Sequence, residues 1–471
     1  MNLVADAVFF GLRRVVVVAV AAGALNAFAA PPLRAKVALD RQNAVYKLGE
    51  TATFSVSIVN ADDTPATNGV LQVALDDFGT NRVFRAFAHD LSQTNGFSVS
   101  GSLDAPGFLR LRLSGVPLEI PPGGWNEYSV WSAAFEPERI RSAVVDPADF
   151  DAYWEGERRR LAKEVPADVQ LEVCPEATTA EHYVFRVSAA TFGNRRLHGW
   201  LGLPRNSSAP APLAVQISAA GFGPWSQLPQ LRAGVISMFL TVFPFQPDPR
   251  DHENRRSDFN AFEQSLRDRF GASYPHAGAL VSREAYFYHD VLLGIDRLVD
   301  WAVSALPIDR ARVACIGTSQ GGGLSLMTLA LNRNFTRGAV YVPALTDFSR
   351  VAHDGRRSGW PQFHENFPGW SAEASAAFER DVAPYFDAVN FARRVAVPIR
   401  FAVGFRDNTC PPHAVYSAFN ACGSRQKSIT CGVDMAHGVQ DWIYRANDGW
   451  ACGPVDETDV NSEKPSHEKG K

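Results

Sequence analysis

The sequence predicts an α/β domain built on a mostly parallel sheet, preceded by a smaller all-β domain. Residues 51–58 alternate between polar and apolar side chains, which is the period of a half-buried β-strand. From residue 146 onward, amphipathic helical stretches alternate with short apolar strands, as in a parallel sheet covered by helices. Residues 313–316 form an apolar run that turns sharply, through glycines, into a helical pattern. A chain of 471 residues is long enough for two such domains.

The amino terminus carries the pattern of an export signal. Arg13 and Arg14 precede an apolar run at residues 15–25, and residues 27–29 read Ala-Phe-Ala, which is typical of a cleavage site. The run is shorter than the roughly 18 residues that a membrane-spanning helix needs, although a membrane anchor is the alternative. We therefore predict that residues 1–29 are a signal peptide. The mature protein is then periplasmic or secreted, with no stable membrane insertion after processing.

Residues 31–125 predict a β-sandwich of immunoglobulin-like kind. The alternating pattern of residues 51–58 recurs at residues 71–75 and 109–113, and clusters of Asp, Pro and Gly form turns between these strands. This segment contains no grouping of catalytic residues. We expect a structural or docking module, with a sugar-binding module as the alternative.

Residues 143–452 predict the α/β domain. Residues 150–161 have the spacing of an amphipathic helix, and residues 286–303 that of a longer one. The expected strands are apolar and short, and lie at residues 213–217, 235–242, 312–316 and 399–403. Residues 453–471 are polar and charged, and are expected to form a disordered tail.

Charge and cysteine content narrow the class of protein. The net charge is −4, and no basic stretch is interleaved with aromatic residues, so we predict no nucleic-acid partner. The six cysteines permit disulfides in an exported protein, and Cys422 and Cys431 are the pair that the sequence favours, although it does not settle whether they are bridged. Cys315 and Cys410 are expected to be buried free thiols. The absence of a Cys-x-x-Cys pair argues against a cysteine zinc site, and we predict no bound metal.

The pattern Gly-Thr-Ser-Gln-Gly at residues 317–321 marks the candidate nucleophile. A strand, a sharp turn and a helix with Ser319 at the apex form a nucleophile elbow. Glycines on both sides of the serine leave room for the strained turn. The helix behind it offers backbone N–H groups to a developing negative charge.

A serine hydroxyl needs a base in contact with it and an acid that orients the base. Behind a nucleophile elbow, the acid and then the histidine follow the serine along the chain. Asp407 follows the expected strand at residues 399–403, and His437 lies in a loop after an expected strand at residues 428–431. We predict that Ser319, Asp407 and His437 form a catalytic triad.

Other carboxylates and histidines fit this order less well. Asp434 lies three residues before His437 and is expected to cap its loop. Asp347 follows the strand after the elbow, which is an occasional position for the acid. The remaining candidate histidines precede the elbow, precede the late strands or lie beside Asp407, and are expected to be core or surface residues: His276, His289, His353, His364 and His413.

The oxyanion hole is expected to use two backbone N–H groups. One belongs to Gln320, the residue after the nucleophile, and the other to the loop at residues 218–223. Small residues in this loop let the backbone approach the substrate oxygen. On spacing alone, any N–H within residues 220–222 qualifies.

Over residues 146–450 the chain resembles the acetyl xylan esterase and cephalosporin C deacetylase family, carbohydrate esterase family seven, which has the α/β-hydrolase fold. The resemblance is carried by residues 317–323, 407–412, 419–420, 149–154, 286–288, 309–312 and 385–392. It implies that Ser319, Asp407 and His437 are the triad. It also implies that Phe222, in the place of the family's aromatic donor, is the second oxyanion residue beside Gln320.

The chain departs from the family pattern at two places. Residues 220–222 read Ala-Gly-Phe where the family has His-Gly-Tyr. Residues 243–246 read Phe-Pro-Phe-Gln in the region where the family's Arg-Gly-Gln motif is expected. The first difference removes the contacts that the family's histidine makes. The second affects the family's substrate contacts and its ring-like oligomer, so no oligomeric state is predicted.

Together these features predict an exported serine esterase that removes acetyl groups from acetylated xylan or related acetylated sugars. The reaction passes through an acetyl-serine intermediate and uses no cofactor. Trp225, Trp360 and Trp370 are candidates for stacking on sugar rings, with core or lid packing as the alternative. Two other functions stay open: a serine peptidase or broad-specificity hydrolase of the same fold, and a carbohydrate-binding protein with a vestigial hydrolase domain.

Overall fold

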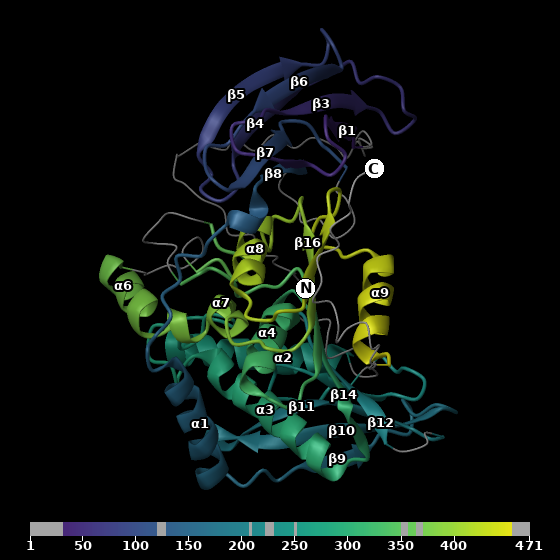
Figure 1. Ribbon diagram of the computed structural model, residues 1–471, viewed down its shortest axis with the longest axis vertical. Helices are drawn as coiled ribbons and strands as arrows, with labels where there is room; N and C mark the ends of the chain where they lie inside the picture. Colours follow the sequence, from purple (N-terminus) through teal and green to yellow (C-terminus); the bar gives the residue numbers. More distant parts are fainter. Residues whose placement is uncertain are drawn as a thin grey trace, which may run out of the picture.

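The computed structural model describes residues 32–119, 129–206, 210–221, 230–248, 252–349, 357–363 and 371–454. The predicted signal peptide lies outside these ranges, as does the predicted tail beyond residue 454. Within the described ranges, no helix combines the length and the apolar character needed to cross a membrane. Figure 1 shows a β-rich part at one end of the molecule and a larger α/β part at the other.

The β-rich part, here called the N-terminal module, consists of strands β1 to β8 in two sheets. One sheet has the order β1-β3-β6 and the other β2-β8-β7-β4-β5. All neighbouring strands are antiparallel except β2 and β8. The strands are β1 (Arg34–Leu39), β2 (Val45–Tyr46), β3 (Ala52–Val59), β4 (Val70–Asp77), β5 (Val83–Asp90), β6 (Gly96–Gly101), β7 (Gly107–Ser114) and β8 (Ser129–Phe135).

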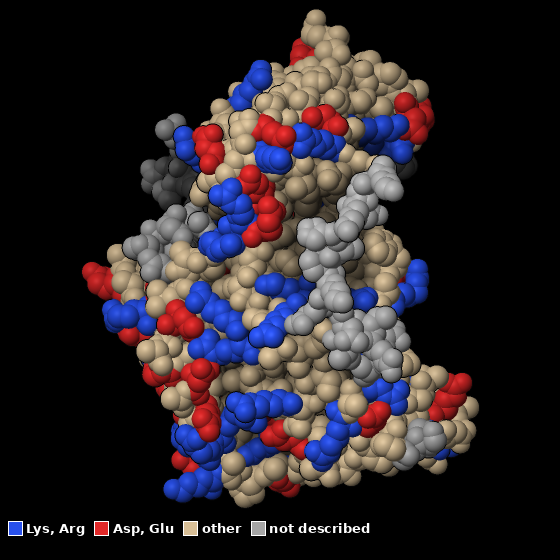
Figure 2. All heavy atoms as spheres, in the orientation of Figure 1, with Lys and Arg blue, Asp and Glu red and all other residues tan. Residues whose placement is uncertain are grey.

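The two sheets enclose one apolar core, as the alternating pattern predicts. Phe54 and Ile58 of β3 are fully buried, and they belong to the same cluster as Leu109 and Leu111 of β7 in the other sheet. The five-stranded sheet includes β8, which lies beyond the boundary at residue 125 that the sequence suggests. In Figure 2, acidic and basic side chains alternate along the edge of this module.

The larger part, here called the C-terminal unit, is built on a nine-stranded sheet. Its order is β17-β16-β15-β14-β12-β13-β11-β10-β9. The strands from β12 to β17 pair in parallel, whereas β9, β10 and β11 add an antiparallel edge. The strands are β9 (Gln170–Val173), β10 (His182–Thr191), β11 (Arg195–Pro204), β12 (Ala211–Ile217), β13 (Ile236–Leu240), β14 (Ile308–Thr318), β15 (Arg337–Tyr341), β16 (Ile399–Gly404) and β17 (Lys427–Gly432).

Helices cover both faces of this sheet. Along β14, Val313 and Cys315 pack in a cluster with residues of α3 and α4. The alternate residues Ala314 and Ile316 pack in a second cluster with Ile443 of α9. The helices are α1 (Phe150–Glu164), α2 (His252–Phe270), α3 (Phe287–Ala305), α4 (Gln320–Leu331), α6 (Ala372–Asp381), α7 (Ala388–Ala392), α8 (Pro412–Ala421) and α9 (Asp441–Cys452).

Cys422 and Cys431, the pair that the sequence favours for a disulfide, are not bridged: both are free thiols. The ammonium of Lys427, at the start of β17, donates to the carbonyl of Cys422 at 2.7 Å. Cys431 lies near the other end of this strand. The sulfur of Cys431 lies 3.1 Å from the hydroxyl of Tyr416. Cys315 and Cys410 are buried free thiols, as predicted.

Candidate active site

Ser319 stands at the sharp turn between β14 and α4. Its φ of 57° and ψ of −122° lie outside the regions that residues with a Cβ favour, so the turn is strained. A Cβ on Gly321 would lie 2.1 Å from the carbonyl oxygen of Ile217, and one on Gly317 would lie 2.1 Å from that of Gly321. The glycines on both sides of the serine are therefore required by close backbone contacts, as a nucleophile elbow predicts.

The carboxylate of Asp407 is held in the loop that follows β16. This residue is fully buried. Its Oδ1 accepts hydrogen bonds from the backbone N–H groups of Thr409 and Cys410, both at 2.8 Å. Its Oδ2 lies 2.9 Å from Nδ1 of His437. One carboxylate oxygen thus ties the side chain to its own loop, and the other accepts the imidazole proton.

His437 joins this carboxylate to the serine. Its Nε2 lies 2.9 Å from Oγ of Ser319, so the hydroxyl donates to the ring while Nδ1–H donates to Asp407. Burial by itself lowers the pKa of His437. The charges of Asp407 and Cys410 and their hydrogen bonds outweigh burial and raise this pKa well above 6.5. The imidazole is thereby oriented by the acid and placed to accept the serine proton.

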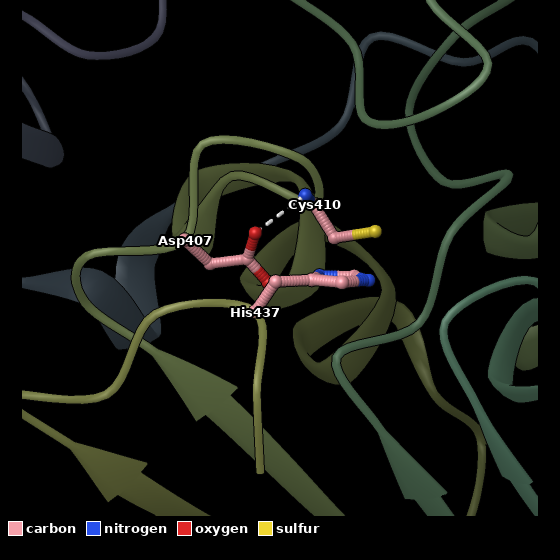
Figure 3. Close-up of side chains that lie close together, drawn as sticks. All are labelled: Asp407, Cys410 and His437. Atoms are coloured by element: carbon pink, nitrogen blue, oxygen red, sulfur yellow. Dashed lines mark hydrogen bonds and ion pairs between the residues drawn. The ribbon is translucent and has the colours of Figure 1, made fainter. Parts of the chain in front are cut away.

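Cys410 lies beside the imidazole, and Figure 3 shows its thiol pointing in the same direction as the ring of His437. Burial raises the pKa of this thiol, while His437 lowers it. Asp407, Cys410 and His437 are close enough to share a cation. However, both oxygens of Asp407 and both ring nitrogens of His437 already have hydrogen-bond partners. The geometry fits an acid–base pair better than a metal site.

The side chain of Gln320 links the elbow to the predicted oxyanion loop. Its Oε1 accepts hydrogen bonds from the hydroxyls of Tyr274 and Tyr288, at 2.6 and 2.7 Å. Its Nε2 donates to the carbonyls of Ser218 and Ala219, at 3.3 and 3.2 Å. All four contacts are buried or partly buried. The carboxamide therefore fixes where the loop after β12 lies relative to Ser319.

Tyr274 also adjoins the same loop: burial raises the pKa of its hydroxyl overall, although the backbone of Gly221 lowers this pKa. Gly221 has a φ of +94°, a conformation that favours glycine. Phe222, the other predicted oxyanion residue, lies outside the described residues. Sequence reasoning missed Tyr274 and Tyr288, although the latter lies in a segment that carries the family resemblance.

The rival residues have other partners. Asp347 accepts hydrogen bonds from Ser142 and, at 2.8 Å, from Ser417, and neither serine belongs to the elbow. His276, His289 and His413 contact Pro361, Glu157 and Arg357 respectively. His353, His364, Trp225 and Trp370 lie outside the described residues.

Trp360 is partly buried and packs against both apolar clusters of the C-terminal unit. Its ring lies 6.0 Å from that of Tyr274. This tryptophan therefore has a packing role next to the site.

The fold and the site together define a class of protein. A mostly parallel sheet carries Ser319 at the apex of a strand–turn–helix. Asp407 and His437 follow it along the chain. His437 hydrogen-bonds to Ser319, and Asp407 hydrogen-bonds to His437. This is the arrangement of the α/β-hydrolases.

The particular family follows from comparison with known proteins. Residues 136–445 match the acetyl xylan esterase (AXE1) family, and the chain belongs to it. An acetyl esterase of Xylanibacter ruminicola, Axe7A, is 26% identical over 396 residues, which cover 83% of this chain and 84% of that protein.

Two solved structures share the fold. Acetyl xylan esterase 1 from Thermoanaerobacterium sp. JW/SL YS485 has a TM-score of 0.54 and 19% identity, and the match covers 67% of this chain and 97% of that one. The acetyl xylan esterase from Paenibacillus sp. R4 has a TM-score of 0.52 and 21% identity, with 67% and 98% covered. These likenesses place the C-terminal unit among α/β-hydrolase folds.

Proposed function

We propose that the protein is a serine esterase that removes acetyl groups from acetylated xylan or related acetylated sugars. The observation that carries this proposal is the unbroken hydrogen-bonded chain from Ser319 through His437 to Asp407. Membership of the acetyl xylan esterase family supports the choice of an acetyl ester as substrate.

In the first half of the proposed reaction, Oγ of Ser319 attacks the acetyl carbon while its proton passes to Nε2 of His437. Asp407 stabilises the imidazolium that forms. The negative oxygen of the tetrahedral intermediate accepts hydrogen bonds from the N–H of Gln320 and from the loop that contains Phe222. When this intermediate collapses, Nε2–H gives its proton to the departing sugar oxygen, leaving an acetyl group on the serine.

In the second half, a water molecule attacks the acetyl-serine carbonyl and His437 takes one of its protons. Collapse of the second tetrahedral intermediate breaks the bond to Oγ. The proton on Nε2 returns to Oγ of the serine, and acetic acid leaves and ionises in the solvent. Each half therefore restores the charge of the histidine, and no redox partner is needed.

The deciding experiment measures acetate release from acetylated xylan by the wild type and by Ser319→Ala. We expect Ser319→Ala to lose at least about 10⁴-fold in kcat and all labelling by a fluorophosphonate probe. Ser304→Ala is the matched control, because this hydroxyl contacts only the carbonyl of Trp301 among the hydrogen bonds described for it. Retained acetate release in Ser319→Ala would refute the proposal. Cleavage of peptides but not of acetyl esters would favour a peptidase.

The same proposal includes export and domain organisation. The arginine pair, the apolar run at residues 15–25 and the Ala-Phe-Ala at residues 27–29 support a signal peptide of residues 1–29. Amino-terminal sequencing of the protein from the producing cell tests the signal peptide, and an uncleaved chain would contradict it.

The N-terminal module is proposed to be an immunoglobulin-like sandwich. Two facing sheets around one core support this proposal.

A further inference from the structure

Strand β8 of the N-terminal module is buried on both sides of its sheet. All seven residues of β8 are buried. Trp131 and Ala133 pack in the core of the module, whereas Ala134 packs in a cluster with Phe405 and Tyr416 of the C-terminal unit. An antiparallel sandwich commonly leaves its outer faces to water. Figure 1 shows β7 and β8 on the side of the module that faces α8 and β16.

The segment that covers this face is the loop that carries Asp407. The carbonyl of Phe405 accepts a hydrogen bond from the hydroxyl of Ser132 on β8, and this contact is buried. The ring of Phe405 meets that of Phe108 on β7 edge-on, with 5.1 Å between centroids. The residue two before Asp407 is therefore held by two neighbouring strands of the module.

Arg406, the next residue, is held in the same way. Its Nε donates to the carbonyl of Val130 at 2.7 Å, and its guanidinium lies 4.2 Å from the ring centroid of Trp131. Its backbone N–H donates to the carbonyl of Met435 at 3.0 Å, two residues before His437. Arg406 thus connects the module to both loops of the candidate site.

Asn408, the residue after the acid, completes the set. Its Oδ1 accepts hydrogen bonds from Arg110 of β7, at 3.4 Å, and from Arg357. Arg110 is buried and makes two hydrogen bonds with the buried carboxylate of Asp76, at 2.8 and 3.0 Å. A paired, buried guanidinium of this kind has little freedom to move.

We propose that the N-terminal module is a positioning element for the catalytic acid. The carboxylate of Asp407 bonds to its own loop and to His437, so its place depends on the shape of that loop. The module fixes this shape through Ser132, Val130 and Arg110. The inference rests on the proposed function. Because a misplacement of about 1 Å can cost about 100-fold in rate, loosening the loop lowers kcat without a contact to substrate.

The experiment compares Ser132→Ala, Asn408→Ala and the double variant with the wild type, using the full chain and 4-nitrophenyl acetate. Rates are divided by the number of active sites titrated with a fluorophosphonate, which removes any unfolded fraction. We expect kcat to fall about threefold to tenfold in each single variant and further in the double variant, with KM changed less than about twofold.

The pH profile gives a readout that a merely structural role would not move. Asp407 and Cys410 are the ionisable groups that raise the pKa of His437. Because a looser Asp407 stabilises the imidazolium less, the acid limb of kcat/KM moves to lower pH in the variants. Ser100→Ala is the control, because this hydroxyl pairs with that of Thr53 within the module. We expect it to keep the wild-type kcat and pH profile.

The outcomes separate this inference from the proposed function. If Ser319→Ala is inactive but the double variant keeps both kcat per titrated site and the acid limb, the module has no positioning role and the inference is overturned. A loss confined to the number of titrated sites would overturn it too. If Ser319→Ala keeps its activity, the proposed function fails instead.

Discussion

The carboxamide of Gln320 offers the sharpest test of how the oxyanion loop is held. The change Gln320→Leu removes four hydrogen bonds, to Tyr274, Tyr288, Ser218 and Ala219, and leaves the backbone N–H of the residue in place. At about 1 kcal/mol net for each hydrogen bond, the free energy of unfolding should fall by about 4 kcal/mol.

The effect on the rate has a separate origin. The loop after β12 is then no longer hydrogen-bonded to the elbow, so the N–H group that we propose as its oxyanion donor moves away from the substrate oxygen. Losing one such donor costs about 3 kcal/mol of transition-state stabilisation, or about 100-fold in kcat. Both quantities are measurable: urea denaturation gives the stability, and acetate release from 4-nitrophenyl acetate gives kcat.

Asn332→Leu is a matched control at the end of the same helix. Its buried amide donates to Asp296 and Asp300, both at 2.9 Å, and these residues lie outside the site. We expect this variant to lose stability and keep kcat. The reasoning is refuted if Gln320→Leu loses stability but keeps its kcat per titrated site within about twofold.

Three further predictions follow from other contacts. Gly321→Ala should prevent correct folding of the elbow, since the new Cβ meets the Ile217 carbonyl at 2.1 Å; a soluble variant with unchanged melting temperature would contradict this. Because His437 must be neutral to accept a proton and its pKa is raised, kcat/KM should fall as pH drops, with a midpoint above 6.5. A midpoint at or below 6.5 counts against the Asp407 contact. Since Cys422 and Cys431 are free, reducing agent should leave the melting temperature unchanged. The exposed Cys431 should react with a thiol reagent before unfolding, whereas the buried Cys422 should not.

Local patterns were enough to predict that Ser319, Asp407 and His437 come together. The glycines around Ser319 reflect close backbone contacts within a short segment, and the order of Asp407 and His437 follows from the order of the strands that carry them. Apolar spacing also predicted the helices α1 and α3 and the strands β12, β13, β14, β16 and β17. The antiparallel edge of β9, β10 and β11 was not predicted.

Contacts between segments that are distant along the chain produce no such local pattern in the sequence. Tyr274 and Gln320 lie 46 residues apart, and neither position has a periodicity that relates it to the other. The burial of β8 on both faces is likewise a tertiary effect. Spacing along the chain also did not show that Cys422 and Cys431 are free, with the sulfur of Cys431 next to the hydroxyl of Tyr416.

The apolar cluster that joins the N-terminal module to the C-terminal unit has a consequence for how the chain folds during synthesis. Ser132 and Phe405, which meet in the folded protein, are separated by 273 residues. At 5–20 residues per second, a ribosome needs roughly 15 to 55 s to make the intervening chain. Throughout that interval the residues of β7 and β8 that later pack against the C-terminal unit are exposed. The nascent chain therefore presents an apolar surface to which chaperones can bind.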